Sequence, residues 1–296
     1  MKRWAAAVCV AGLGLSGMAW AEPISFEQAA NVTGLAGIEV GADVDYAYTK
    51  VEKEGLPKTE QAFMDVPVFV RVGLPVLEAK VTVPYGTAKS TVQDNLGKNS
   101  QDQNYSGLKN VGLMVKTALT LPVVSLGAGV DANFPTGDPK KYLGEGLDIQ
   151  PFVAAGIDAM VLKIYANAGF QYRGDYTFSV TGFDAGGNPI VDQGVKLKPG
   201  NDVRYAVGLE IPAGDVLSLH AELLGDKYGN AALDGNVIDN TAGSTLKLVP
   251  GIRLHAGPFK AKIAYEIPLE KKDDRPQYAP AADWRILAGV SLQFSL

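Results

Sequence analysis

The protein has 296 residues, of which 47% are hydrophobic, and carries a formal net charge of −5. The negative charge argues against a nucleic-acid partner, because phosphates attract basic surfaces. A single cysteine excludes an internal disulfide framework, so the fold must depend on a large core or on a closed hydrogen-bonded sheet.

The first residues have the pattern of a secretory signal peptide. Positive charge in Met1–Arg3 precedes an almost wholly apolar run, 4–17, and small residues follow at Ala19 and Ala21. We expect cleavage after Ala21, which removes Lys2 and Arg3 and changes the net charge from −5 to −7. The apolar run is too short to cross ~30 Å of hydrocarbon as a helix, and no later run reaches ~20 apolar residues.

From Ile38 onward, apolar and polar residues alternate with the period of two that indicates β-strands. The pattern predicts twelve strands and no helix. The predicted strands are Ile38–Thr49, Val66–Val72, Leu77–Tyr85, Val111–Leu119, Val124–Phe134, Leu147–Ile157, Leu162–Tyr172, Val203–Ile211, Leu217–Leu223, Leu246–Leu254, Phe259–Ile267 and Trp284–Phe294.

The two faces of these strands differ in kind. The apolar face contains no charged residue, whereas the other face carries many acids and bases. Because an unpaired ion in a dry core costs several kcal/mol, the charged face must meet water. We therefore predict that a water-facing lumen is lined by Asp43, Arg71, Lys80, Asp131, Lys163, Arg173, Arg204, Glu210, Glu222, Arg253, Lys262 and Arg285.

The connections between the predicted strands alternate between short and long. Tight turns rich in Pro and Gly join five strand pairs, and longer polar segments join the other six. An even-numbered antiparallel meander of this kind is typical of a bacterial outer-membrane barrel, with periplasmic turns and extracellular loops. We expect the segment Gly86–Ser106 or the hairpin Tyr176–Val195 to fold over the mouth as a constriction.

Outward-facing aromatic residues gather near the strand ends, as the girdles at the two boundaries of a membrane would. Two lie at the short-turn ends, Phe259 and Phe294. The long-loop ends carry Tyr46, Tyr48, Tyr85, Phe134, Phe170, Tyr172, Tyr205, Tyr265 and Trp284.

Four prolines fall inside predicted strands, although a closed sheet has no free edge for a missing amide hydrogen. We expect bulges or strand ends at Pro67, Pro84, Pro151 and Pro250.

One stretch of the chain resembles a known family. The motifs Leu126–Val130, Pro135–Pro139, Leu143–Gly146 and Asn167–Gly174 are similar to those of the transporter-like barrels named after the meta-pathway of phenol degradation. The likeness is strongest over Gly107–Gly174. It implies an outer-membrane channel that passes aromatic or other hydrophobic compounds, and it implies no catalytic or ligand residue.

These observations define the expected organisation. Residues 1–21 form the signal peptide, 22–33 a periplasmic N-terminal segment or partial plug, and 34–296 an all-β, transmembrane, antiparallel up-and-down barrel of about twelve strands. The expected location is the bacterial outer membrane, and the expected partners are its lipid and lipopolysaccharide, a small-molecule solute and the barrel-assembly machinery. The chain ends Phe294-Ser295-Leu296, which keeps an outward apolar residue for that machinery. We expect a monomer.

Candidate catalytic chemistry is sparse. His220 and His255 fall on the inward face of neighbouring predicted strands, but a metal or acid–base site needs a third group fixed in geometry. Serines Ser90, Ser100 and Ser106 share one predicted extracellular segment, while both histidines lie towards the other end, which excludes a Ser-His pair in this topology. We predict no enzyme activity, no cofactor and no metal.

Two functions remain open. Twelve strands lie between ~8, where side chains nearly fill a barrel, and ~16, where a water-filled channel is open. The chain is then either a passive channel for small solutes or a closed structural or adhesion barrel filled by paired side chains. Because the predicted lumen residues mix acids and bases, the sequence predicts no strong selectivity for ions of one sign.

Overall fold

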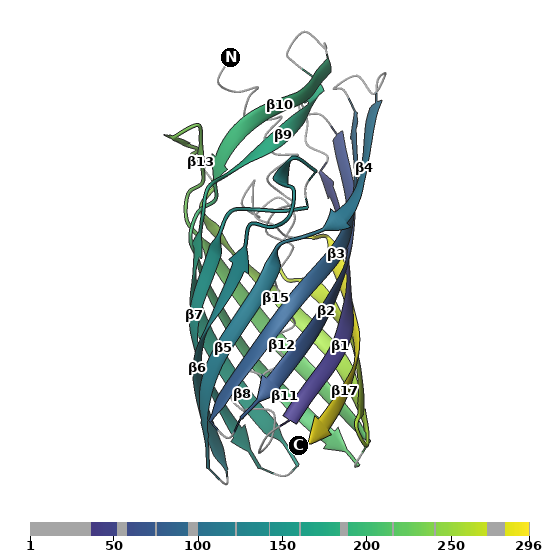
Figure 1. Cartoon of the computed structure of the whole chain (residues 1–296), viewed down its shortest axis with the longest axis vertical. Helices are drawn as coiled ribbons and strands as arrows, with labels where there is room; N and C mark the ends of the chain where they lie inside the picture. Colours follow the sequence, from purple (N-terminus) through teal and green to yellow (C-terminus); the bar gives the residue numbers. More distant parts are fainter. Residues whose placement is uncertain are drawn as a thin grey trace.

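Twelve antiparallel strands form one closed barrel in the computed structural model. The structure describes residues 37–51, 58–93, 100–183, 189–270 and 282–295, apart from positions 75, 122, 142, 160, 215 and 240. The tilted strands follow the chain in order around the wall (Figure 1). They are β1 (Gly37–Val51), β2 (Lys58–Gly73), β3 (Leu77–Gln93), β5 (Val111–Thr120), β6 (Val124–Phe134), β7 (Asp148–Asp158), β8 (Lys163–Arg173), β11 (Asp202–Ala213), β12 (Leu217–Tyr228), β15 (Gly243–Ala256), β16 (Phe259–Pro268) and β17 (Trp284–Ser295).

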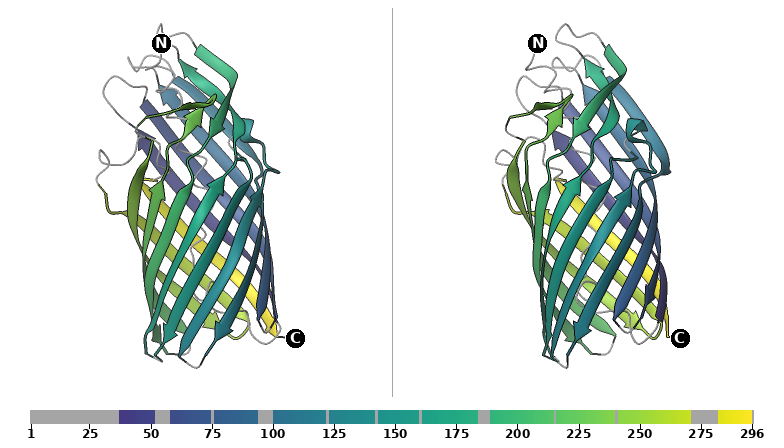
Figure 2. Two further views of the ribbon diagram at one scale, coloured as in Figure 1. Left: turned by 90° about the vertical axis from the view of Figure 1, so that its left-hand side faces the viewer. Right: turned by 60° about the vertical axis from the view of Figure 1, so that its left-hand side comes forward.

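The ring closes where the first and last strands meet. β1 pairs with β17 from Gly37 opposite Ser295 to Tyr48 opposite Trp284, and β2 pairs with β3 along its whole length. Closure satisfies the backbone groups that an edge strand would leave open. The structure thus confirms the predicted all-β, up-and-down, twelve-stranded barrel, and Figure 2 shows the closed wall from two further sides.

The long-loop end carries more regular structure than the sequence pattern predicted. Most of the expected loop Gly86–Ser106 is strand, because β3 continues to Gln93 and pairs with β4 (Ser100–Leu108). The described part of this hairpin extends the wall upward (Figure 1), so the first of the two segments expected to fold over the mouth does not do so, and the expectation for Tyr176–Val195 stays a prediction. The predicted hairpin Tyr176–Val195 is present as β9 (Tyr176–Phe183) and β10 (Pro189–Lys198), to which β13 (Ala232–Leu233) and β14 (Asn236–Val237) add. A short 3-10 helix, η2, spans Pro139–Lys141.

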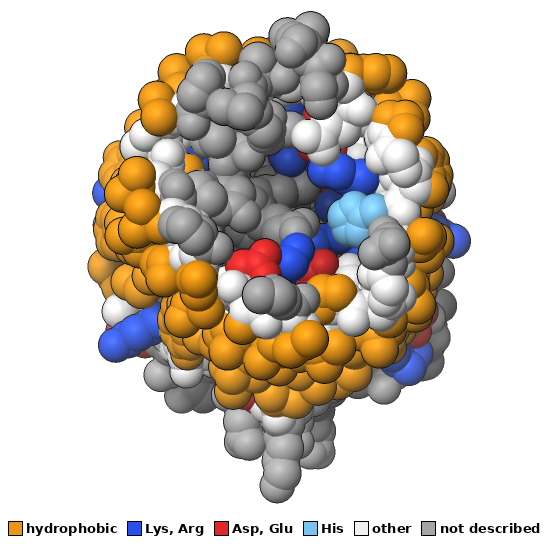
Figure 3. Space-filling view, turned by 90° about the horizontal axis from the view of Figure 1, so that it is seen from below, with side chains coloured by type: hydrophobic (Ala, Val, Ile, Leu, Met, Phe, Trp, Pro, Cys, Tyr) orange, Lys and Arg blue, Asp and Glu red, His pale blue; other side chains and the backbone are white. Residues whose placement is uncertain are grey.

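The two faces of the wall differ as predicted. Apolar side chains on the outside stay about half exposed, for example Val207 at 52% and Ile263 at 54%. Charged side chains lie within the ring, and Figure 3 shows them inside an apolar rim seen from the short-turn end. An apolar outside around a charged inside reverses the layout of a soluble domain and is that of a barrel surrounded by lipid.

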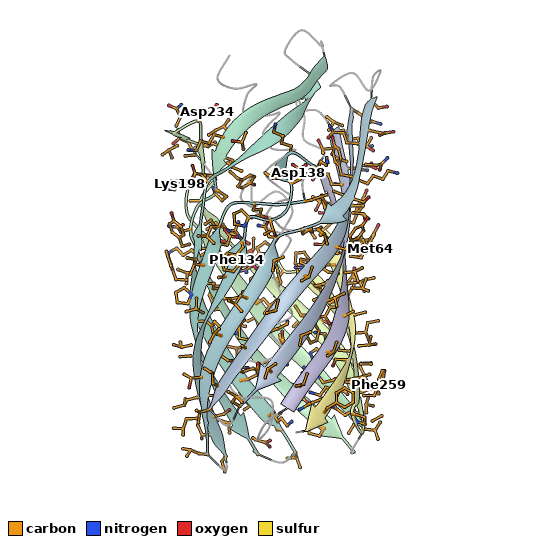
Figure 4. The ribbon with its side chains drawn as sticks, in the orientation of Figure 1. Met64, Phe134, Asp138, Lys198, Asp234 and Phe259 are labelled. Carbon is orange, nitrogen blue, oxygen red and sulfur yellow. The ribbon has the colours of Figure 1, made fainter. Side chains whose placement is uncertain are left out.

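The aromatic residues lie where the pattern placed them. Phe134 and Tyr205 are more than 40% exposed near the long-loop end, and Phe259 is 40% exposed near the short-turn end. Figure 4 shows Phe134 and Phe259 at opposite ends of the apolar wall. The Trp284 ring lies 5.4 Å from the ring of Tyr46, between centroids.

The expected bulges at the prolines do not occur. Pro67 and Pro84 face each other across β2 and β3. The β1–β2, β7–β8 and β15–β16 ladders each skip two residue pairs beside Pro67, Pro151 and Pro250 and then resume in the same register. Pro84 lies where β3 changes partner from β5 to β4. Each proline therefore interrupts one ladder locally without displacing the strand.

None of the described helices is long and apolar enough to span a membrane. The predicted signal peptide, 1–21, and N-terminal segment, 22–33, lie outside the described residues.

Candidate functional site

The charged lumen is the candidate site. Eight of the twelve predicted lumen residues are buried against the wall, namely Arg71, Lys80, Arg173, Arg204, Glu210, Glu222, Arg253 and Arg285. The other four are partly exposed: Asp43, Asp131, Lys163 and Lys262. Whether these residues border a conducting path stays a prediction, but the structure shows what eleven of them contact.

A belt of alternating charge, the long-loop belt, crosses six adjacent strands near the long-loop end. Its members, in order around the wall, are Asp45, Arg285, Glu266, Lys247, Asp226 and Arg204. Arg285 Nη1 lies 3.7 Å from Glu266, Lys247 Nζ lies 3.2 Å from Glu266 and 3.6 Å from Asp226, and Arg204 Nε lies 2.8 Å from Asp226. Each inner member faces opposite charge on both sides, which offsets the cost of burial.

A second chain of charges, the short-turn cluster, spans β16 to β5 at the other end. It consists of Lys260, Glu39, Arg71, Glu78 and Lys116. Glu39 accepts from Arg71 at 2.9 Å and from the Ser291 hydroxyl at 2.6 Å, while Lys116 lies 3.1 Å from Glu78. The carboxylates of this cluster are thus held at the wall.

Eight more of the predicted residues have local partners. Arg253 donates a hydrogen bond to Glu210 at 3.1 Å, and Lys163 Nζ lies 4.0 Å from the same carboxylate. The Tyr165 hydroxyl donates to Glu222 at 2.8 Å. In separate pairs, Lys262 lies 3.1 Å from Asp43, Arg173 lies 2.7 Å from Asp202, and Lys80 Nζ lies 4.6 Å from the centroid of the Phe69 ring.

Sequence reasoning missed several members of these networks. Asp202 and Asp226 complete ion pairs with predicted residues, but they lie one and three residues beyond the predicted strands Val203–Ile211 and Leu217–Leu223. Glu39 and Asp45 were within a predicted strand and on the polar face. Alternation along the strand was the signal for all four, and for Asp202 and Asp226 it also required longer strands.

The segment between β6 and β7 packs against the long-loop end of the barrel. The Asn110 side chain donates to the Glu145 carbonyl at 3.2 Å and accepts from the Gly137 amide at 3.1 Å, and Leu143 is 3% exposed. The Glu145 carboxyl is buried there as well. Burial, reinforced by the Asp148 charge, raises the pKa of Glu145 to about 8.

The raised pKa predicts how stability depends on pH. The unfolded Glu145 titrates near 4.5, so between about pH 4.5 and 8 the folded state holds a proton that the unfolded state has lost. Stability therefore falls as pH rises through that window. We expect Glu145→Gln to raise the free energy of unfolding relative to the parent by about 1 kcal/mol or more at pH 8, and to leave it unchanged near pH 4. Urea unfolding at the two pH values measures the difference.

The control for this measurement is Glu60→Gln, since Glu60 is 40% exposed and also lies at the long-loop end. Its pH profile should follow that of the parent. Parallel profiles for the Glu145→Gln variant and the parent would contradict an ionisation penalty at Glu145.

The two histidines do not face each other in the ladders. His220 lies opposite Gly251 on β15, and His255 lies opposite Lys260 on β16. Among the described residues, no three side chains of the His, Cys, Asp or Glu type are placed to hold a metal ion. The absence of enzyme activity, of a cofactor and of a metal stays a prediction.

Known proteins share the fold but not the sequence. The chain matches no family model and no curated protein. It is similar to the COG4313 outer membrane channel from Pseudomonas putida F1, with a TM-score of 0.67 and 13% identity over 93% of this chain and 100% of that one. It is also similar to the TodX monoaromatic hydrocarbon channel, with a TM-score of 0.54 and 11% identity over 88% and 90%. A third likeness is to the transport unit of the autotransporter AIDA-I from Escherichia coli, with a TM-score of 0.50 and 8% identity over 100% and 98%. At such identities the comparisons show the outer-membrane barrel fold alone.

Proposed function

We propose that this protein is an outer-membrane channel for the passive passage of small solutes. One observation carries the proposal: a closed ring with an apolar outside encloses charged side chains that stay partly open to solvent. Lys163 and Lys260 keep 28% and 31% of their side-chain surface exposed inside that ring. Both lysines stand beside short turns, so water reaches the lumen from the short-turn end, and a wetted lumen is the first requirement of a pore.

In the proposed orientation the short turns face the periplasm and the long loops face the outside. The barrel then stands in the outer membrane as a monomer, in contact with its lipid and lipopolysaccharide, after export and insertion by the barrel-assembly machinery.

The proposal extends to the class of solute that the channel passes. The likeness of Gly107–Gly174 to the barrels of the phenol-degradation meta-pathway family, together with the fold shared with a monoaromatic hydrocarbon channel, supports small aromatic or hydrophobic solutes. A liposome swelling series with sugars of graded size and with phenol would rank them. Relative to protein-free liposomes, a greater acceleration by the protein for phenol than for a neutral sugar of similar size is the expected result.

A closed structural barrel is the second candidate, because one observation favours it. The long-loop belt joins six strands through ion pairs of 3.7 Å or less, and such a network fills space as well as stabilising the wall. Its loops would then act by meeting extracellular partners.

Single-channel recording in planar bilayers separates the two candidates. We expect reproducible conductance steps from refolded protein and none from the same preparation unfolded by heat. A correctly folded barrel, judged by its shifted mobility on unheated gels, that inserts but stays electrically silent would support the structural candidate instead.

A further inference from the structure

A small cavity opens from the lumen near the short-turn end. Its charged lining comes from Arg253, Lys260 and Lys262 on one side and from Glu39 and Asp43 on the other. The accessible volume is about 30 Å³, which holds one or a few water molecules or the head of a small ligand. Three cations thus meet two carboxylates around one space.

The carboxylate side chains of this region are less exposed to solvent than its lysine side chains. The Glu39 side chain is 2% exposed and is held by both Arg71 and Ser291. Lys260 approaches it only at 3.9 Å and remains 31% exposed, and Lys262 remains 20% exposed beside an Asp43 that is 14% exposed. A solute entering this space therefore meets ammonium groups before it meets carboxylates.

The cavity also has an apolar wall. The Phe69 ring borders it, and this ring fits only because position 41 is glycine: a Cβ there would lie 2.6 Å from the tip of the ring. The backbone of Gly289 leaves room for the Asp43 and Lys262 side chains in the same way. Lys80 lies over the Phe69 ring, adding positive charge at its face.

We propose that this cavity binds the carboxylate of a small organic acid, with Lys260, Lys262 and Arg253 around the anion and Phe69 beside its carbon skeleton. Charge-assisted hydrogen bonds from several cations are the usual means of holding a carboxylate, and an aromatic wall favours an aromatic acid. The site gives the channel a preference for anions at its periplasmic end. That preference rests on the proposed function, whereas the binding does not.

Binding is tested first, without any conduction. Saturation-transfer NMR of the detergent-solubilised barrel should show contact with benzoate and much weaker contact with benzyl alcohol. The double variant Lys260→Gln/Lys262→Gln should weaken benzoate binding several-fold. The charge-conserving pair Lys260→Arg/Lys262→Arg should retain it, and so should Lys89→Gln/Lys227→Gln, which removes two exposed lysines from the outer face.

Selectivity is tested next, by the reversal potential across a bilayer with a KCl gradient. We expect the parent to favour chloride, the Lys260→Gln/Lys262→Gln channel to lose most of that preference, and the outer-face control to keep it. All variants are first checked for the shifted gel mobility of the folded barrel.

The outcomes separate the two proposals. A silent barrel that still binds benzoate through Lys260 and Lys262 would overturn the channel and leave the site standing. Equal binding of benzoate and benzyl alcohol, or a conducting barrel whose double variant binds benzoate as the parent does, would overturn the anion site and leave the channel standing.

Discussion

Replacing Lys247 with methionine is expected to lower the free energy of unfolding by about 3–5 kcal/mol, the usual cost of leaving buried charges without their partner. Lys247 is 5% exposed and bridges Asp226 and Glu266 in the middle of the long-loop belt. Its loss leaves two buried carboxylates with one fewer cation between them. Urea unfolding of the barrel in liposomes, followed by tryptophan fluorescence, measures the change.

Two further variants make that result specific to the belt. Lys227→Met removes an exposed lysine from the neighbouring strand and should cost less than about 1 kcal/mol. Adding Glu266→Gln to Lys247→Met should recover part of the loss, because Asp45–Arg285 and Asp226–Arg204 then remain as two complete pairs. If Lys247→Met cost no more than Lys227→Met, the belt would contribute only as much as exposed ion pairs do.

An arginine at Val207 is expected to destabilise the barrel by about 2–4 kcal/mol, as a cation on the lipid face near the middle of the membrane does. Val207 is 52% exposed and lies halfway along β11, opposite Ala166 and Leu223. In water such a substitution would be nearly neutral, so the cost reports on lipid around the wall. The same unfolding assay in liposomes measures it.

Val237→Arg is the matched control, since Val237 is 63% exposed on β14, which is outside the barrel ring. It should leave stability unchanged within about 0.5 kcal/mol. Equal, small effects at Val207 and Val237 would mean that the apolar face of β11 does not meet hydrocarbon.

Much of the architecture could be predicted from the sequence, because its determinants are local. A period of two, as in Ile38–Thr49, depends only on the pleat of a strand, and it assigns each residue to one face. Tight turns and long loops alternate along the chain and fix the up-and-down order. Twelve strands, their faces and the aromatic ends followed from these two patterns.

Strand length was predicted less well, and strands predicted too short left out acidic residues of the candidate site. Above the apolar band, polar residues such as Thr91 and Asp102 pair across β3 and β4, and Asp226 continues β12 beyond Leu223. Backbone pairing continues where the apolar signal stops, because a hairpin in water needs no lipid-facing residues. Two of the acids that complete the lumen networks, Asp202 and Asp226, lie in such extensions.

By itself, the sequence determined which side chains face inward, since alternation is a property of each strand alone. Only the tertiary structure decided which acid meets which base, because that depends on the stagger of twelve strands around a closed ring. The same stagger buries Glu39 against Arg71 while Lys260 stays open to solvent. The inward-facing residues mix acids and bases in the sequence, yet near the short-turn end the lysines are more exposed than the carboxylates.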